Sequence, residues 1–191
     1  MSGGAHVGGS CVVRAPSRTL TLDRHYAALI PRSDRRTIGD AARKGGAVLS
    51  EDKGITLVRR FEEDWRPFWT RVAKLDAEGL RKIPTGSTWP TWLILAHCAR
   101  WEDWNHDTIS THLSDGSTPS MAGFDQWNEE WAREDRDMTP EDARRWLGEA
   151  HERLRLLLDG IRAEQWDDLV SRCIEACTFH HYGEHIGDLP V

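Results

Sequence analysis

The chain has 191 residues, of which 39% are hydrophobic, and it carries a formal net charge of −6 at pH 7. This length and composition suit one domain with its own core, and the negative charge argues against nucleic acid as the main partner. No apolar run approaches the roughly 18 residues of a membrane span, and no secretory signal is recognisable, so we expect a cytoplasmic protein that does not bind membranes.

Residues 1–47 differ in composition from the rest of the chain. They hold eight Lys or Arg and three Asp or Glu, and all ten tryptophans lie after position 60. A segment with so few apolar residues and no helical or strand period cannot bury a core. We therefore predict a disordered, basic N-terminal extension over residues 1–47 and a folded domain over residues 48–191.

The junction sequence RKGGAVLSEDKG suggests a second explanation for this extension. Purine-rich codons can encode its Arg-Lys-Gly-Gly, and Val48 follows closely. A ribosome-binding site followed by a GTG start codon would look like this in translation. The hypothesis is then that the natural chain begins near Val48 and that the extension is not native.

The first main helix is predicted to begin at Ile55. Its apolar residues recur every three or four positions as far as Leu75, which is the period of an amphipathic helix. Pro67 falls inside this pattern and predicts a kink or break near Trp65, because proline lacks the backbone N–H that the helix needs.

The second main helix follows the sequence TGSTWPTW. Ser87 or Thr88 is expected to cap it, and Pro90 suits its first turn. The helix is predicted to run to about Leu113, with Gly116 among the turn-forming residues that end it.

Three more helices complete the pattern. A short one is expected around residues 124–131. The next begins with Thr139 as N-cap and Pro140 in the first position, and it ends at Gly160. The last is predicted over residues 165–187.

Strand patterns are absent, so the fold class is all-α, and four amphipathic main helices predict a four-helix bundle. The link between the second and third main helices is about 25 residues long. A link of that length can cross the bundle, so these two helices can run parallel.

Histidines near the C-terminus suggest a metal site. In CTFHHYGEHIGDL, His181 and His185 are four residues apart and share one helix face, so both can bind one ion. His97 is the best third candidate, because it lies within the apolar stretch WLILAHCARWEDW, where an unpartnered histidine is costly to bury. Three such ligands leave coordination positions open, as in catalytic sites. On spacing alone, a solvated histidine-rich surface is the alternative.

Residues near His181 and His185 are further candidate ligands. Cys173 and Cys177 continue the four-residue spacing, so Cys177 can face the site, although free cysteine is usually a small core residue. His180 and Glu184 lie on the adjacent face, where they can bond the ligands or be solvated. His151, in EAHERLR, is predicted to lie on the surface.

Three segments together, GSTWPTWLILAHCARWEDW, FDQWNEEWA and CTFHHYGEHIGDL, resemble the DinB-like superfamily. That superfamily includes DNA-damage-inducible proteins, thiol-dependent S-transferases and mycothiol-dependent maleylpyruvate isomerases. The likeness covers about residues 55–189. Its pattern is carried here by Trp89, Ala96, His97, Trp101, Glu102, Asn128, Trp131, His181, Tyr182, Glu184 and His185. Pro90 and Pro67 depart from the usual pattern.

The resemblance implies a bundle with up-down-down-up topology, a homodimer, and a divalent metal, most often zinc or nickel, held by His97, His181 and His185. Trp101 and Tyr182 join the pocket or second-shell candidates His180, Glu184 and Cys177. By analogy the protein would be a transferase, isomerase or hydrolase that uses a low-molecular-weight thiol, mycothiol or bacillithiol, on a small electrophile. The alternative is a non-catalytic stress-response or sequestering protein with the same pocket. No catalytic residue beyond the ligands is identified. The acidic residues Glu102, Asp103 and Asp107 can bind an amine on the thiol, but they are expected to be plain surface charges.

Overall fold

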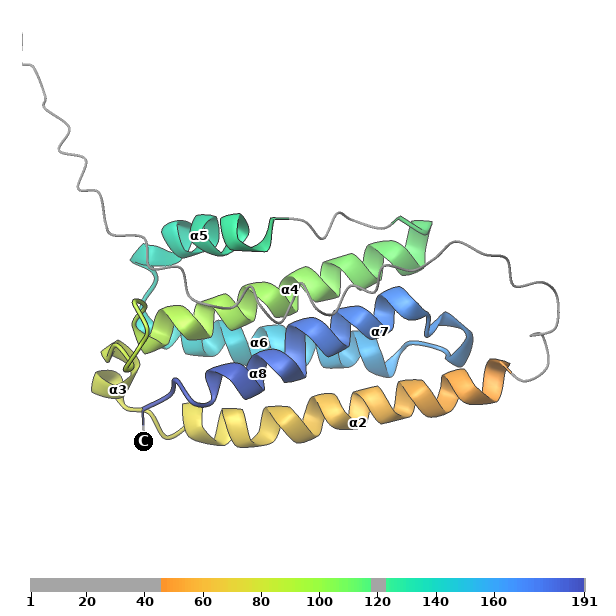
Figure 1. Ribbon diagram of the computed structural model, residues 1–191, viewed down its shortest axis with the longest axis horizontal. Coiled ribbons are helices and arrows are strands. Elements are labelled where there is room, and N and C mark those ends of the chain that lie inside the picture. Colours follow the sequence, from red (N-terminus) through yellow and green to blue (C-terminus); the bar gives the residue numbers. More distant parts are fainter. Residues whose placement is uncertain (1–45, 118–122, 191) are drawn as a thin grey trace, which may run out of the picture. The chain divides into compact units, whose positions relative to one another are not determined.

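The computed structural model describes residues 46–117 and 123–190, and all regular structure in this part of the chain is helical (Figure 1). Residues 1–45 of the predicted extension lie outside it, whereas residues 46 and 47 already belong to the first helix. Side chains are described from Lys53 onward, except those of Cys177 and Phe179. None of the described helices has the length and apolar character to cross a membrane.

Three long helices and one composite helix form the bundle. They are α2 (Gly46–Val72), α4 (Thr91–Asp115), α6 (Pro140–Asp159) and the series α7 (Asp168–Ile174), the π-helical turn η3 (Glu175–Phe179) and α8 (His180–His185). Shorter elements connect them: α3 (Ala77–Arg81), α5 (Phe124–Glu134) and the 3-10 turns Asp135–Asp137 and Ala163–Gln165.

The predicted four-helix bundle and its topology are confirmed. In Figure 1, α4 and α6 run in one direction, while α2 and the α7–α8 series run in the other. The connection through α5 returns along α4, which lets α6 start at the same end of the bundle as α4. The long crossover therefore makes α4 and α6 parallel neighbours, as its length predicted.

Apolar residues at helical spacing build the core. On α6 the buried positions Ala143, Leu147, Ala150, Leu154 and Leu158 form one stripe. All except Ala143, which packs in a smaller cluster with Leu93 and Ala96, belong to the same core as Phe61 and Phe68 of α2, both fully buried. Each buried leucine or phenylalanine side chain contributes about 1.5–3 kcal/mol through burial, so packing of these faces holds the bundle together.

Of the kink or break predicted near Trp65, the break does not occur. The helix α2 continues from Gly46 to Val72 with Pro67 inside it. Pro67 is exposed, so the Glu63 carbonyl that loses its helical partner lies on the solvent side, where water can replace the missing N–H. The helix also begins earlier than Ile55, in the segment assigned to the extension.

The cap predicted for α4 is also wrong. Pro90 is the N-cap residue, and no side chain caps the helix. Ser87 instead accepts a hydrogen bond from the Trp89 backbone N–H at 3.0 Å within the preceding turn. The hydroxyl of Thr91 donates to the Lys82 carbonyl at 2.9 Å, which fixes the start of α4 against the end of α3. At the other end, Gly116 adopts a left-handed conformation (φ 75°), as the turn signal predicted.

The last predicted helix is divided in the structure. It begins at Asp168 rather than at residue 165, because the Asp167 side chain accepts hydrogen bonds from the backbone N–H groups of Leu169 and Val170 and so caps it. The π-helical turn η3 then interrupts the regular spacing before α8. It contains Cys177, so the four-residue series from Cys173 does not continue as one stripe of an α-helix.

Candidate metal centre

The structure brings the three predicted histidines together. His97 comes from the middle of α4, and His181 and His185 lie one turn apart on α8. One ring nitrogen of each lies within 4.8 Å of those of the other two. All three side chains are buried, with exposures of 5%, 4% and 5%. We call His97, His181 and His185 the histidine triad.

The ring nitrogens of the histidine triad are arranged as a shared binding point requires. His97 Nε2 lies 2.8 Å from His181 Nε2. His185 Nδ1 lies 2.9 Å from Asp188 Oδ2, and because an ionised carboxylate only accepts, Nδ1 is the donor; in the neutral ring the lone pair is then on Nε2. That Nε2 is buried and has no hydrogen-bond partner among the described residues. An imidazole lone pair buried in this way suits coordination to a divalent ion, for which metal–nitrogen distances are about 2.0–2.1 Å.

The electrostatics of the site favour the neutral imidazole. Burial lowers the pKa of His97 well below its ordinary value, and the nearby His185 lowers it further. Metal ions bind the unprotonated ring nitrogen, so a lowered pKa keeps His97 in the form that binds. Burial likewise raises the pKa of the neighbouring Cys98 thiol, which keeps it a neutral core residue.

Aromatic rings enclose the histidine triad. The indole of Trp89 meets His97 edge-on, with ring centroids 5.3 Å apart. Trp101 lies edge-on to both His97 and His181, at 6.4 and 6.5 Å. The Trp101 Nε1–H donates to Asn128 Oδ1 at 3.0 Å, which connects α4 to α5. These apolar rings exclude water and so strengthen electrostatic interactions inside the site.

A family model described as the DinB superfamily matches residues 60–187. This chain belongs to the DinB superfamily. Comparison with curated proteins gives no significant match, and neither does comparison with solved structures. The predicted resemblance is thus confirmed, and the superfamily is a metal-binding one, which agrees with a histidine triad that can hold an ion.

The DinB bundle places the other predicted site residues differently. Trp101 borders the histidine triad, as described above, whereas His180 and Glu184 are exposed on α8. Tyr182 is buried but turns away from the triad toward Glu102. The Cys177 side chain lies outside the described part of the structure.

Tryptophans of α4 and α5 form one cluster between these two helices. Trp101 packs against Trp131, with ring centroids 5.1 Å apart, and the ring centroid of Trp127 lies 6.0 Å from that of Trp104. A double hydrogen bond between Arg100 and Asp135, at 3.0 and 2.7 Å, holds the end of α5 on the same side of α4. The helix α5 therefore covers this flank of the metal centre. Of the other tryptophans, Trp65 and Trp166 are buried, and Trp69, Trp92 and Trp146 are half-buried.

Two surface predictions are wrong in this DinB protein. His151 is 5% exposed and stacks on Trp65, with ring centroids 3.8 Å apart, and on Phe61 at 4.4 Å. Glu102 is fully buried. The polar neighbours of His151 in EAHERLR suggested an exposed position. The spacing of the apolar residues of α6 indicates a buried one, because His151 falls on the same stripe as Leu147, Leu154 and Leu158.

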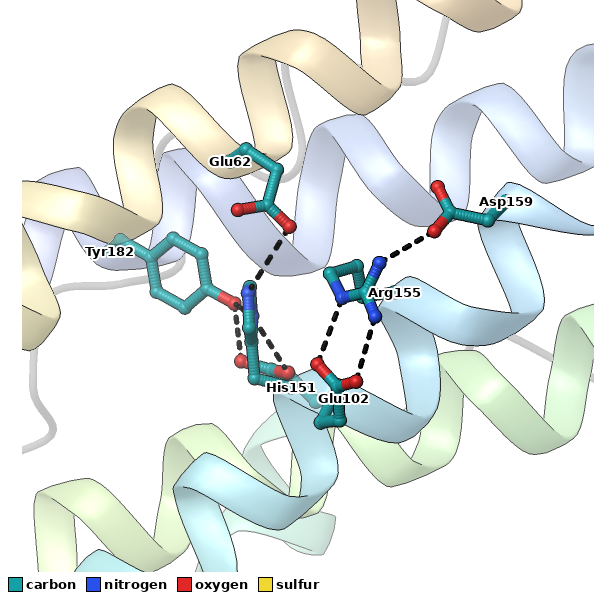
Figure 2. Close-up of polar contacts among 7 residues, drawn as sticks. Glu62, Glu102, His151, Arg155, Asp159 and Tyr182 are labelled. Carbon is teal, nitrogen blue, oxygen red and sulfur yellow. Dashed lines mark hydrogen bonds and ion pairs between the residues drawn. The ribbon is translucent and has the colours of Figure 1, made fainter.

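Glu102, His151 and Tyr182 form a second buried polar cluster, which we call the buried trio (Figure 2). The Tyr182 hydroxyl donates a short hydrogen bond to Glu102, and His151 Nδ1 lies 3.2 Å from the Tyr182 oxygen. Burial raises the pKa of Glu102, and burial followed by the Glu102 charge raises that of Tyr182, so the phenol keeps the proton that it donates. On the far side of the ring, His151 Nε2 faces Glu62 at 3.9 Å.

Two side-chain contacts of the candidate site were not predicted from the sequence. Asp188 contacts His185, and a carboxylate three residues after a candidate ligand, near the end of a helix, is the signal that would have found it. Glu102 of α4 accepts a hydrogen bond from Tyr182 of α8. The sequence signal for this contact is that Glu102 lies on the buried stripe of α4 that also contains Leu95, Cys98 and Ile109.

Proposed function

We propose that this protein binds one divalent metal ion, zinc or nickel, through the histidine triad. The observation that carries the proposal is the convergence of three buried imidazoles from two helices, with one Nε2 lone pair left without a partner. A neutral three-histidine set suits these borderline metals and leaves the full 2+ charge of the ion to be offset by an anion.

We further propose that this site serves a low-molecular-weight thiol, such as mycothiol or bacillithiol, in transfer to or isomerisation of a small electrophile. A bound divalent ion supplies positive charge that lowers the pKa of a thiol or water and favours its anion. The chain itself contributes the enclosure: Trp89 and Trp101 limit access of water to the triad, which strengthens attraction between the site and an anionic sulfur. Hydrolysis at the same site is the corresponding reaction with water as nucleophile.

A surface groove near the histidine triad supports a small substrate. It is lined by Trp89, Leu93, Glu129, Ala132 and Arg133 and lies between α4 and α5. Trp89 lines this groove and also contacts His97, so a molecule in the groove lies one aromatic ring away from the triad. The groove is partly apolar and carries one charge of each sign, which suits a small electrophile with a polar group.

The second candidate function is binding without turnover, as in sequestration during stress. It needs the same buried triad and the same groove. The two functions therefore differ in turnover and not in the binding site.

Metal content tests the first proposal. The purified full-length protein is loaded with zinc or nickel, freed of excess ion, and assayed for bound metal by mass spectrometry. The wild type should hold about one ion per chain, and single His97→Ala, His181→Ala and His185→Ala variants should lose most of it. His180→Ala is the matched control, because His180 is exposed and adjacent to a proposed ligand. Full metal content in all three triad variants would refute the site.

Turnover tests the second proposal. The metal-loaded protein is incubated with mycothiol, bacillithiol and glutathione, each with a panel of small electrophiles, and loss of free thiol and formation of adducts or isomers are followed. Metal-dependent turnover with one thiol supports the enzyme. Saturable binding of an electrophile with no turnover across the panel supports the sequestering protein instead.

A further inference from the structure

The helices that carry the histidine triad are connected at a second point. His97 and Glu102 belong to α4, and His181 and Tyr182 belong to α8. The contact between His97 and His181 therefore lies beside the contact between Glu102 and Tyr182. We propose that the buried trio sets the position of α8 against α4 and so preorganises the histidine triad, with Tyr182 and Glu102 as positioning residues. This inference rests on the metal site proposed above.

The short helix α8 needs such an anchor. It has six residues and follows a π-helical turn, and a helix of that length is not stable by itself, so tertiary contacts must hold it. Arg71 of α2 donates to the Ile186 carbonyl at 2.7 Å, which fixes only the C-terminal end of this segment. At the level of the triad ligands, the hydrogen bond from Tyr182 to Glu102 connects α8 to α4.

Because the hydrogen bond between Tyr182 and Glu102 is buried, losing it is costly. Glu102 is fully buried, and Tyr182 is 1% exposed. A buried carboxylate that loses a hydrogen bond is unfavourable, so Glu102 holds the Tyr182 hydroxyl in place. His151 Nδ1 lies 3.5 Å from the other Glu102 oxygen, so a shift of α8 would take away one of the two partners of this carboxylate. An apolar contact tolerates sliding far better, because the attraction between apolar groups has no preferred direction.

His151 of α6, the third member of the buried trio, contacts both Tyr182 and Glu102. Because the phenol proton goes to Glu102, the His151 Nδ1–H must be the donor in the 3.2 Å contact with the Tyr182 oxygen. The His151 ring is itself held by stacking on Trp65, with ring planes only 8° apart. The buried trio thus connects α4, α6 and α8, while its stacking partner belongs to α2. All four helices of the bundle thus contribute to the position of the Tyr182 hydroxyl.

The decisive variant is Tyr182→Phe. It removes the hydroxyl and keeps the ring that packs on Phe68, with centroids 5.3 Å apart. We expect zinc affinity to fall on the order of 10- to 100-fold, as for other residues that orient ligands without touching the metal. We also expect the visible absorption of the cobalt(II)-loaded variant to change, because that spectrum reports ligand geometry. Wild-type affinity together with a wild-type cobalt spectrum would overturn the inference.

Two further variants separate positioning from a general loss of stability. Ser171→Ala removes another buried hydroxyl, which donates to the Asp167 carbonyl at 2.7 Å on α7, and it should leave zinc affinity unchanged. Glu102→Gln keeps a carbonyl oxygen that accepts from Tyr182, so it should retain affinity within a few-fold of the wild type. An affinity loss in Ser171→Ala equal to that in Tyr182→Phe would contradict a positioning role.

The double variant Glu102→Leu/Tyr182→Phe completes the test. Replacing both polar groups by apolar ones removes the buried carboxylate that Tyr182→Phe leaves short of one hydrogen bond, so thermal stability should recover relative to Tyr182→Phe. If the polar contact positions α8, zinc affinity should stay low although stability recovers. Recovery of both would show that Tyr182 only satisfies Glu102. Retention of zinc by the three triad variants would instead refute the proposed metal site itself, so the two failures are distinguishable.

Discussion

The Nδ1 atom of His185 lies 2.9 Å from Asp188 Oδ2, at the point where α8 ends. This contact decides which ring nitrogen of His185 carries the proton and orients Nε2 toward His97 and His181. Asp188 follows the helix and is partly exposed, so it acts on the histidine triad from outside.

Replacing Asp188 by alanine should therefore weaken metal binding without removing a ligand. His185 would lose the partner that fixes its tautomer, and affinity for zinc should fall on the order of 10- to 100-fold. Competition with a chromophoric chelator measures the dissociation constant. Glu184→Ala is the control, since Glu184 is an exposed acidic residue of the same helix, and it should bind zinc like the wild type. Equal affinities for the wild type and Asp188→Ala would show that Asp188 has no role.

A second histidine–carboxylate pair gives a pH-dependent prediction. His112 Nε2 lies 2.6 Å from Asp167 Oδ2, and this hydrogen bond raises the pKa of His112 above its ordinary 6.5, against a smaller opposing effect of burial. The folded state then binds the proton more tightly than the unfolded state. The stabilisation is complete below about pH 6.5 and disappears as the pH rises through the raised folded value.

The variant His112→Gln should therefore lower the free energy of unfolding more at pH 6 than at pH 9. The difference should be about 0.5–1 kcal/mol, because Asp167 is half exposed and solvent screens the pair. Urea denaturation of chelator-treated protein at both pH values measures it and excludes the pH dependence of metal binding. A stability loss that is the same at both pH values would contradict the linkage.

The N-cap of α6 gives a third prediction. The Thr139 hydroxyl accepts a hydrogen bond from the Asp142 backbone N–H at 3.1 Å. Thr139→Ala leaves this N–H unpaired and should lower the free energy of unfolding by about 1 kcal/mol. Thr111→Ala, at an exposed position inside α4, should instead be neutral or slightly stabilising, because alanine has the higher helix propensity. If both substitutions changed stability alike, the cap would not contribute.

The ends of α6 were predicted well from the sequence, although the cap of α4 was not. Thr139, Pro140 and Gly160 mark the ends of α6 because a cap depends on the residues beside it. The meeting of His97 with His181 was also predicted, although these residues are far apart in the sequence. Its basis was the shared helix face of His181 and His185 together with the apolar surroundings of His97, and the family resemblance supplied the same three residues.

Features that depend on packing between helices were not predictable in the same way. Charged neighbours made His151 and Glu102 look exposed, and only the partner helix shows that the two side chains meet. The π-helical turn leaves no clear mark in the sequence around Cys177, yet it changes which side chains of the last helix share a face. The division of that helix therefore had to come from the structure.

The fourth prediction concerns Gly54, where α2 meets the connection between α6 and α7. A Cβ atom added there would lie 2.6 Å from Trp166 Nε1, a rigid indole that is 8% exposed. Gly54→Ala should thus force the helix and the indole apart and lower the free energy of unfolding by about 1–3 kcal/mol, despite the better helix propensity of alanine. Gly183→Ala is the matched change, because a Cβ on Gly183 in α8 meets no atom within 4 Å, and it should stabilise the protein by about 0.5–1 kcal/mol. Thermal and urea denaturation of both variants measures the contrast. A stabilised Gly54→Ala protein would mean that Trp166 does not pack against α2.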